Sequence, residues 1–218
     1  MFFPYKDDNP KILVPYVTYG ILIINTALFL LQSIISGSDI NLYNSLLFKF
    51  GFIPSNFNIF TIFTSMFMHA NLAHIIGNLW FLKIFGDNVE SVLGHIKYLI
   101  FYLCCGFIAA IGQYIINPAS TIPMIGASGA IAGILGAYMI QFPNARVHNF
   151  LFFFIIFTKV TLPAQIVLGF WFLFQLSQGL IELGVNTTGG VAWFAHIGGF
   201  IGGVTLLRYL KNFKIEII

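Results

Sequence analysis

Four polar side chains lie inside long apolar stretches of this sequence and are of types that suit acyl-transfer chemistry: His74, Asn78, Ser128 and His196. A serine hydroxyl is a weak nucleophile at neutral pH, and a hydrogen-bonded neutral histidine is its usual activator. The tetrahedral intermediate of acyl transfer also needs hydrogen-bond donors aimed at its oxyanion. The backbone N–H of Ser128, the Asn78 amide and an N–H of His74 are candidates for that role. These residue types predict Ser128 as nucleophile and His196 as general base.

No carboxylate is expected at the same depth as these residues, so we predict a Ser–His dyad without a third member. Glu182 is the single candidate for a third member of a triad. A zinc site is the main rival use of the histidines. The sequence has no His-Glu-x-x-His motif, and no Asp or Glu is expected in the same layer of the membrane as His74 and His196. We therefore expect no metal and no other cofactor.

Two of the candidates, Ser128 and His74, also have a purely structural interpretation. Taken alone, Gly126-Ala127-Ser128-Gly129 favours a small-residue packing motif in which the hydroxyl bonds to a backbone carbonyl. His74 taken alone could be an interfacial histidine bonded to a loop. However, His74 and Asn78 are four residues apart and share one helix face. The presence of His196 together with this pair favours the catalytic interpretation.

The elements that must position these residues are membrane helices, as the composition indicates. Of the 218 residues, 58% are hydrophobic and 8% are charged, and the mean hydropathy is +0.90. A soluble domain carries about 25% charged residues, so we predict an integral membrane protein in a lipid bilayer. The net charge of +3, without a long basic run, argues against nucleic-acid binding. Cys104 and Cys105 are adjacent, which argues against an ordinary disulfide and a metal cluster.

Long stretches without ionisable residues predict an all-α membrane protein, with six transmembrane helices in a single domain over residues 1–218. A spanning helix needs about 20 mostly apolar residues. The longest uncharged stretch, Tyr98 to Ala145, has room for two helices, separated by the turn-forming segment Asn117 to Pro123. The predicted spans are residues 14–36, 70–88, 97–116, 125–142, 163–182 and 191–209. The segments 37–69 and 149–157 are predicted to lie in the membrane interface without crossing it.

The basic residues predict the orientation of the chain in the membrane. With the amino terminus inside, every Lys and Arg except Lys49 falls at a cytoplasmic helix end. Both termini are then cytoplasmic, and an odd number of spans would place the two basic termini on opposite sides. On this threading the four candidate residues lie at similar depths, just below the outer interface. Polar residues in spanning helices are costly, so their gathering there indicates a functional site.

Small residues predict that the fourth and sixth spans contact each other directly below Ser128 and His196. Helices in lipid approach closely where glycine and alanine remove side-chain bulk. The small residues at helical spacing beneath the two candidates are Ala132, Gly136, Gly199 and Gly203. Close contact along this stripe would bring the serine hydroxyl to the imidazole.

These motifs, in this order and in these spans, resemble those of the rhomboid intramembrane serine proteases. The matching segments are Gly126-Ala127-Ser128-Gly129, His74-Ile-Ile-Gly-Asn78 and Ala195-His196-Ile-Gly-Gly199-Phe-Ile-Gly-Gly203. The resemblance covers essentially the whole chain and implies a rhomboid-like helix bundle. It also implies cleavage of transmembrane protein substrates near the outer face, with Ser128 as nucleophile, His196 as base, and His74 and Asn78 on the oxyanion side.

Two positions depart from the family pattern. Many members carry a Trp-Arg pair in the first outer loop, where this chain has Phe60-Thr61. Some members have a tyrosine packed under the base, where this chain has Ala132. We expect other contacts to hold the imidazole of His196, with Trp193 or nearby glycine backbone as candidates. The resemblance further implies that the fifth span, or the loop Leu183 to Gly190, is a gate for substrate.

We therefore expect a serine endopeptidase whose partners are single-span or other transmembrane protein substrates and the lipid bilayer. The alternative is a non-proteolytic rhomboid-like protein that binds membrane clients. Such proteins lack the serine or the histidine, and this chain has both. A small transporter is disfavoured because the polar groups stop short of the inner half of the bilayer. The absence of an extra span or a transit-like amino terminus predicts a bacterial cytoplasmic (inner) membrane.

Overall fold

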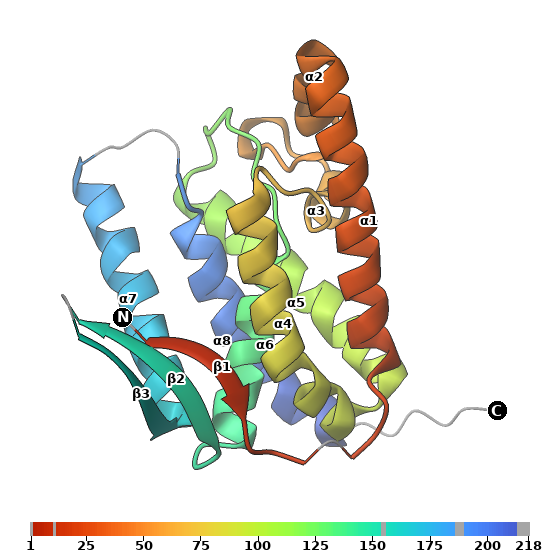
Figure 1. Cartoon of the computed structure of the whole chain (residues 1–218). Helices are drawn as coiled ribbons and strands as arrows, with labels where there is room; N and C mark the ends of the chain where they lie inside the picture. Colours follow the sequence, from red (N-terminus) through yellow and green to blue (C-terminus); the bar gives the residue numbers. More distant parts are fainter. Residues whose placement is uncertain (1, 11, 154–155, 186–189, 213–218) are drawn as a thin grey trace.

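In the part of the chain that the structure describes, six long helices form the framework and lie where the spans were predicted (Figure 1). The computed structural model describes residues 2–10, 12–153, 156–185 and 190–212. The long helices are α1 (Tyr16–Ser38), α4 (Leu72–Leu93), α5 (His95–Ile116), α6 (Ser128–Gln141), α7 (Ala164–Val185) and α8 (Trp193–Asn212). Within the described residues, α1, α5 and α7 are long and apolar enough to cross a membrane, whereas α6 is apolar but has only 14 residues. The chain is thus a mostly helical membrane bundle.

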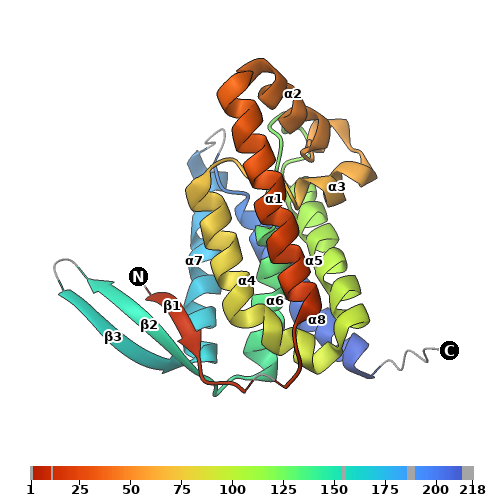
Figure 2. The same ribbon diagram turned by 45° about the vertical axis from the view of Figure 1, so that its right-hand side comes forward.

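Helix α6 is the central helix of this bundle. Its residues from Gly129 to Tyr138 are all buried, as expected for a helix that is apolar on every side. Helices α4, α5, α7 and α8 pack around it, and α1 packs outside against α4 (Figures 1 and 2). The core includes Tyr98 and Tyr102 of α5, both fully buried. This packing fixes the position of Ser128, because Ser128 is the first residue of α6.

The segment between α1 and α4 forms short helices at one end of the bundle. These are α2 (Ile40–Phe50), the 3-10 helix η1 (Pro54–Asn56) and α3 (Ile59–Ser65). They lie at the end where α4, α6 and α8 begin (Figure 2). No residue of α2 is buried. The segment 37–69 does not cross the bundle, in agreement with the prediction. Its place in the membrane interface remains a prediction.

A three-stranded antiparallel sheet lies at the opposite end, so the all-α prediction is wrong there (Figure 2). Its strands are β1 (Phe2–Asp7), β2 (Arg146–Phe153) and β3 (Ile156–Pro163), in the order β1-β2-β3. Phe3 pairs with Phe150, and His148 pairs with Thr161. Of the segment 149–157, predicted to be interfacial, the described residues 149–153 belong to β2 and 156–157 to β3, and its place in the membrane interface remains a prediction. A short apolar aromatic run does not distinguish a strand from an interfacial segment, and the pairing partner β1 lies far away in the sequence.

The carboxylate of Glu90, on α4, forms hydrogen bonds with the start of α1 at the end of the bundle that carries the sheet. The backbone N–H groups of Val17 and Thr18 donate to its carboxylate at 2.9 and 2.8 Å, and the Thr18 hydroxyl donates at 2.7 Å. Pro15, at the N-cap of α1, provides no side-chain cap. The fully buried Glu90 thus caps α1 from another helix.

Candidate active site

Ser128 and His196 lie within hydrogen-bond distance of each other. The Ser128 hydroxyl oxygen is 2.8 Å from Nε2 of His196, and both side chains are partly buried. Ser128 begins α6, and His196 is in the first turn of α8. The backbone N–H of Ser128 belongs to a helix start, where N–H groups have no partner within the helix. The structure therefore brings together the two residues that the sequence predicts as nucleophile and base.

Glycines on both helices permit this approach. A Cβ atom at Gly199 would overlap the backbone of Gly129, and one at Gly203 would overlap the backbone of Gly133. The predicted stripe Gly199–Gly203 on α8 is therefore the contact surface. On α6 the predicted Gly136 also lies against α8, since a Cβ atom there would overlap the carbonyl oxygen of Phe200. Gly129 and Gly133, which the sequence analysis did not name as contact residues, complete the α6 side.

Gln175 of α7 holds the other nitrogen of the imidazole. Its Oε1 lies 2.8 Å from Nδ1 of His196, and its side chain is buried. The sequence analysis named Trp193 as a candidate support. The Trp193 ring lies edge-on at 6.3 Å between ring centroids. Glu182 does not occupy the third position, since Ser128 and Gln175 take the two ring nitrogens. A polar amide following the apolar run 170–174 was the signal for Gln175 that the sequence analysis missed.

His74 and Asn78 lie beside the turn that leads into Ser128. Gly126 in this turn has a φ of 118°, a conformation that favours glycine. A Cβ atom on Gly126 would lie 2.6 Å from Nε2 of His74 and 3.6 Å from Nδ2 of Asn78. The absence of a side chain at Gly126 therefore lets the chain pass close to both donors. The predicted oxyanion-side residues and the nucleophile thus belong to one cluster.

His69 also belongs to this cluster, although the sequence analysis assigned it no role. Its Nε2 lies 2.9 Å from Nδ2 of Asn78, and its ring packs edge-on against His74 at 5.1 Å. Burial lowers the pKa of His69 to about 4, so the imidazole is neutral at physiological pH. Nε2 can then accept a hydrogen bond from the Asn78 amide, whose second N–H remains for other partners. Gln32 of α1 contacts the backbone of His69 from both its amide atoms, at 3.3 and 3.4 Å.

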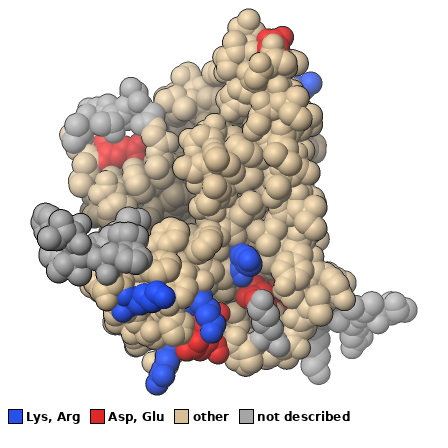
Figure 3. All heavy atoms as spheres, viewed as in Figure 1, with Lys and Arg blue, Asp and Glu red and all other residues tan. Residues whose placement is uncertain are grey.

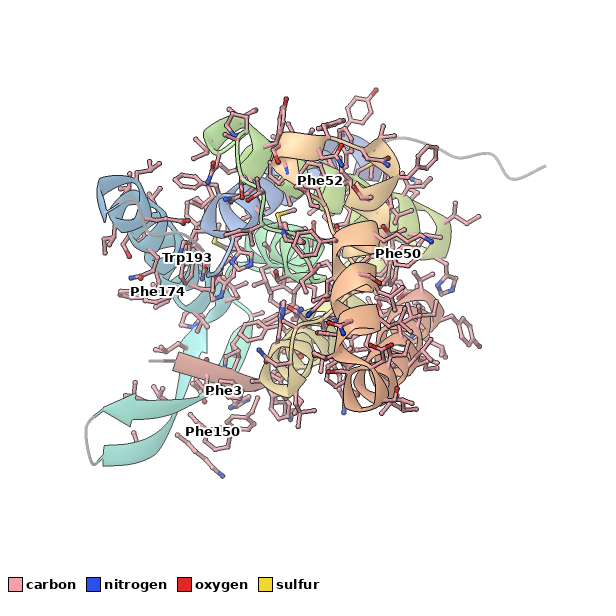
Figure 4. All side chains as sticks on the ribbon, turned by 90° about the horizontal axis from the view of Figure 1, so that it is seen from above. Phe3, Phe50, Phe52, Phe150, Phe174 and Trp193 are labelled. Atoms are coloured by element: carbon pink, nitrogen blue, oxygen red, sulfur yellow. The ribbon has the colours of Figure 1, made fainter. Side chains whose placement is uncertain are left out.

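A cavity of about 1090 Å³ opens around these residues at the end of the bundle that carries α2. Its lining includes His74, Asn78, Ser128, His196 and Glu182. Seen from above, Phe174 of α7 lies beside Trp193 of α8 at this site, with ring centroids 6.0 Å apart (Figure 4). In the described part of the chain, no three His, Cys, Asp or Glu side chains gather as metal ligands. The site therefore offers a hydroxyl, an imidazole and several N–H donors in one pocket.

Residues 56–213 match the family model described as the rhomboid domain. The chain belongs to the rhomboid family. Its relatives include YdcA, a rhomboid-family protein of Bacillus subtilis, at 31% identity over 134 residues, which is 61% of this chain and 66% of the relative. The rhomboid protease GluP of the same organism is 31% identical over 141 residues, covering 64% of this chain and 24% of GluP.

A eukaryotic relative gives a comparable match. The mitochondrial RHOMBOID-like protein 6 of Arabidopsis thaliana is 30% identical over 143 residues, covering 66% of this chain and 41% of the relative. In all three comparisons the matched part is less than two thirds of the relative's length. The similarity therefore concerns the rhomboid domain that the relatives share with this chain.

Proposed function

We propose that this rhomboid is a serine endopeptidase that cleaves transmembrane proteins near the outer membrane face by a Ser128–His196 dyad. The observation that carries the proposal is the 2.8 Å contact between the Ser128 hydroxyl and Nε2 of His196 inside the cavity. Relatives named as rhomboid proteases support this activity.

The proposed reaction follows from the two partners of His196. Nε2 accepts the Ser128 proton while Oγ attacks the scissile carbonyl, and the imidazolium then gives that proton to the leaving amine. Water from the cavity releases the acyl group in a second addition step. The N–H of Ser128, the free N–H of Asn78 and an N–H of His74 are the proposed oxyanion donors. A substrate helix with small or helix-breaking residues near the outer face can present an extended peptide bond.

We further propose that all six long helices cross the membrane as one domain, with both termini in the cytoplasm. On the face seen in Figure 3, basic side chains gather at the end of the molecule that carries the sheet. Pairing of β1 with β2 supports an even number of crossings between them, because both strands must lie on one side. The four helices α1, α4, α5 and α6 meet that condition. We also propose a bacterial cytoplasmic membrane as the location, which is compatible with the two relatives from a bacterium.

Removing either member of the dyad tests the proposal. Ser128→Ala and His196→Ala should each lower the cleavage rate of a single-span reporter in proteoliposomes by at least about 10⁴-fold, because the two act as a unit. Asn78→Ala should cost less, on the order of 10²-fold, since it removes one oxyanion donor. A serine-directed fluorophosphonate should label the wild-type protein but not Ser128→Ala.

Ser177→Ala is the matched control, because Ser177 is exposed on α7 and bonds to the Phe174 carbonyl. This variant should cleave and be labelled as the wild type is. Cleavage that persists in Ser128→Ala would refute the assignment. A wild-type protein that binds membrane clients without labelling or cleavage would instead support the non-proteolytic alternative.

A further inference from the structure

We propose that Gln175 of α7 is a positioning residue that fixes the proton-accepting form of His196. The inference rests on the proposed function, since it gives the residue a part in the same reaction. It goes beyond the dyad because it makes a third helix, α7, contribute to the base. Gln175 acts only through His196, so it is not itself a catalytic residue.

The position of Gln175 points to this role. Only 4% of the residue is exposed, on a helix whose other faces carry exposed apolar side chains such as Phe170 and Leu173. A buried amide in such a helix is costly unless it is hydrogen-bonded. Its Oε1 lies 2.8 Å from Nδ1 of His196. The hydrogen bond therefore offsets the burial of the amide and fixes the ring at the same time.

The chemistry of the imidazole gives this bond a consequence for catalysis. An amide oxygen is only an acceptor, so Nδ1 of His196 must carry the proton that it receives. The neutral ring then has an unprotonated Nε2, which is the nitrogen that faces Ser128. The opposite tautomer would place a proton against the hydroxyl and could not accept another. Gln175 thus selects the form that can act as a general base.

Of the helices around His196, α7 provides the side chain that holds Nδ1 of the imidazole. Position 132 on α6, four residues after Ser128, is an alanine, whose methyl group cannot form a hydrogen bond with the ring. Among the described residues that line the cavity, the titratable side chains besides His196 are His74 of α4 and Glu182 of α7. Neither takes Nδ1, since Gln175 does. The same cavity wall contains Trp171, one turn before Gln175, with its ring centroid 6.0 Å from that of His196.

Gln175→Met tests the inference, because it keeps the side-chain length and removes the acceptor. We expect kcat to fall by roughly 10- to 100-fold, as for other groups that orient a functional histidine, with KM unchanged. The matched control is Gln178→Met, the same exchange one turn further along α7, outside the lining of the cavity. The control should retain wild-type kcat.

Gln175→Glu provides a readout that a purely structural role would not change. A carboxylate also accepts from Nδ1 and stabilises the imidazolium, so it should restore most of kcat. It should also move the acid limb of the pH–rate profile to higher pH, because the base then becomes protonated at higher pH. If Gln175→Met does not fold, an unshifted acid limb in Gln175→Glu overturns the inference by itself.

Nitrogen-15 NMR of labelled histidine separates this inference from the proposed function. The resonances of His196, assigned with His196→Ala, should show a protonated Nδ1 in the wild type and Gln178→Met. In Gln175→Met they should show mixed tautomers. If these spectra are observed but the wild-type protein shows no proteolysis, the positioning role of Gln175 is supported and the protease proposal is refuted. Normal proteolysis with wild-type kcat, pH profile and spectrum in Gln175→Met would overturn the role of Gln175 alone.

Discussion

Two structural constraints require glycine at position 126, two residues before the nucleophile: its backbone conformation and its close contact with His74. Its φ of 118° is unfavourable for other residues, and a Cβ atom there would lie 2.6 Å from Nε2 of His74. Gly94, between α4 and α5, has a φ of 74° but no atom within 4 Å of its Cβ position. Comparison of the two glycines separates backbone strain from the contact with His74.

Gly126→Ala should destabilise the protein by about 1–3 kcal/mol through backbone strain and should also slow fluorophosphonate labelling of Ser128. The added methyl group would displace His74 and the turn before the nucleophile. Gly94→Ala should show a similar loss of thermal stability in detergent with normal labelling. Equal labelling rates in both variants would show that the contact between Gly126 and His74 does not shape the site.

The sequence predicted the four main site residues because each is a polar group in an apolar helix. His74, Ser128 and His196 all lie in the first turns of helices that begin at the same end. Topology alone therefore placed them together. Gln175 is also a polar group in an apolar helix, but its contact with His196 depends on helix rotation, and the position of His69 depends on a loop. Neither of these is encoded in the spacing of apolar residues.

The crossing of α6 and α8 is the element-scale feature on which the dyad depends. Their backbones approach so closely that no side chain fits at Gly199 or Gly203. In lipid, such close packing supplies the van der Waals contact that holds helices together. A wider separation would move the imidazole away from the hydroxyl, so stability and labelling should fall together.

Gly203→Ala should therefore destabilise the protein by about 1–3 kcal/mol, the usual cost of overpacking. Thermal unfolding in detergent, followed by fluorophosphonate labelling of the folded fraction, measures both effects. Gly169→Ala on α7 is the matched control, because no atom lies within 4 Å of its Cβ position. Its stability should be unchanged or slightly higher, since alanine favours helix. Unchanged stability and labelling in Gly203→Ala would contradict close packing of α6 against α8.

At this scale the helices were predictable and the strands were not. The predicted starts of the fifth and sixth spans, residues 163 and 191, lie within two residues of the starts of α7 and α8. Uncharged apolar length determines such boundaries. Strand β1 pairs with a segment that lies beyond four long helices, and no local pattern indicates that partner.

At the scale of the whole molecule, the amino-terminal strand is anchored to the bundle through Asp7. Its carboxylate accepts hydrogen bonds from Nδ2 of Asn88, at 3.0 Å, and from the hydroxyl of Tyr138. Burial raises the pKa of Asp7 above its ordinary value of 3.8. The protonated form is therefore favoured by folding. The stability that this group contributes is present below pH 3.8 and is lost as the pH rises through the folded-state pKa.

Asp7→Asn should accordingly raise the unfolding temperature at pH 7.5, and this gain should shrink as the pH approaches 4. Asp8 is the opposite case, because its hydrogen bond with His148 lowers its pKa. Asp8→Asn should lower the unfolding temperature at pH 7.5, and that loss should disappear as acid protonates the wild-type carboxyl. Parallel pH profiles for the two variants would contradict these assignments.

The pairing of β1 with β2 also constrains the order of events during synthesis. The ribosome makes β1 first, but its partner emerges only after α1, α4, α5 and α6. At typical translation rates this delay is on the order of ten seconds. During that time the first strand has an unpaired edge, a form prone to wrong association. Synthesis of these four helices therefore precedes completion of the sheet, which makes sheet closure a late step of folding.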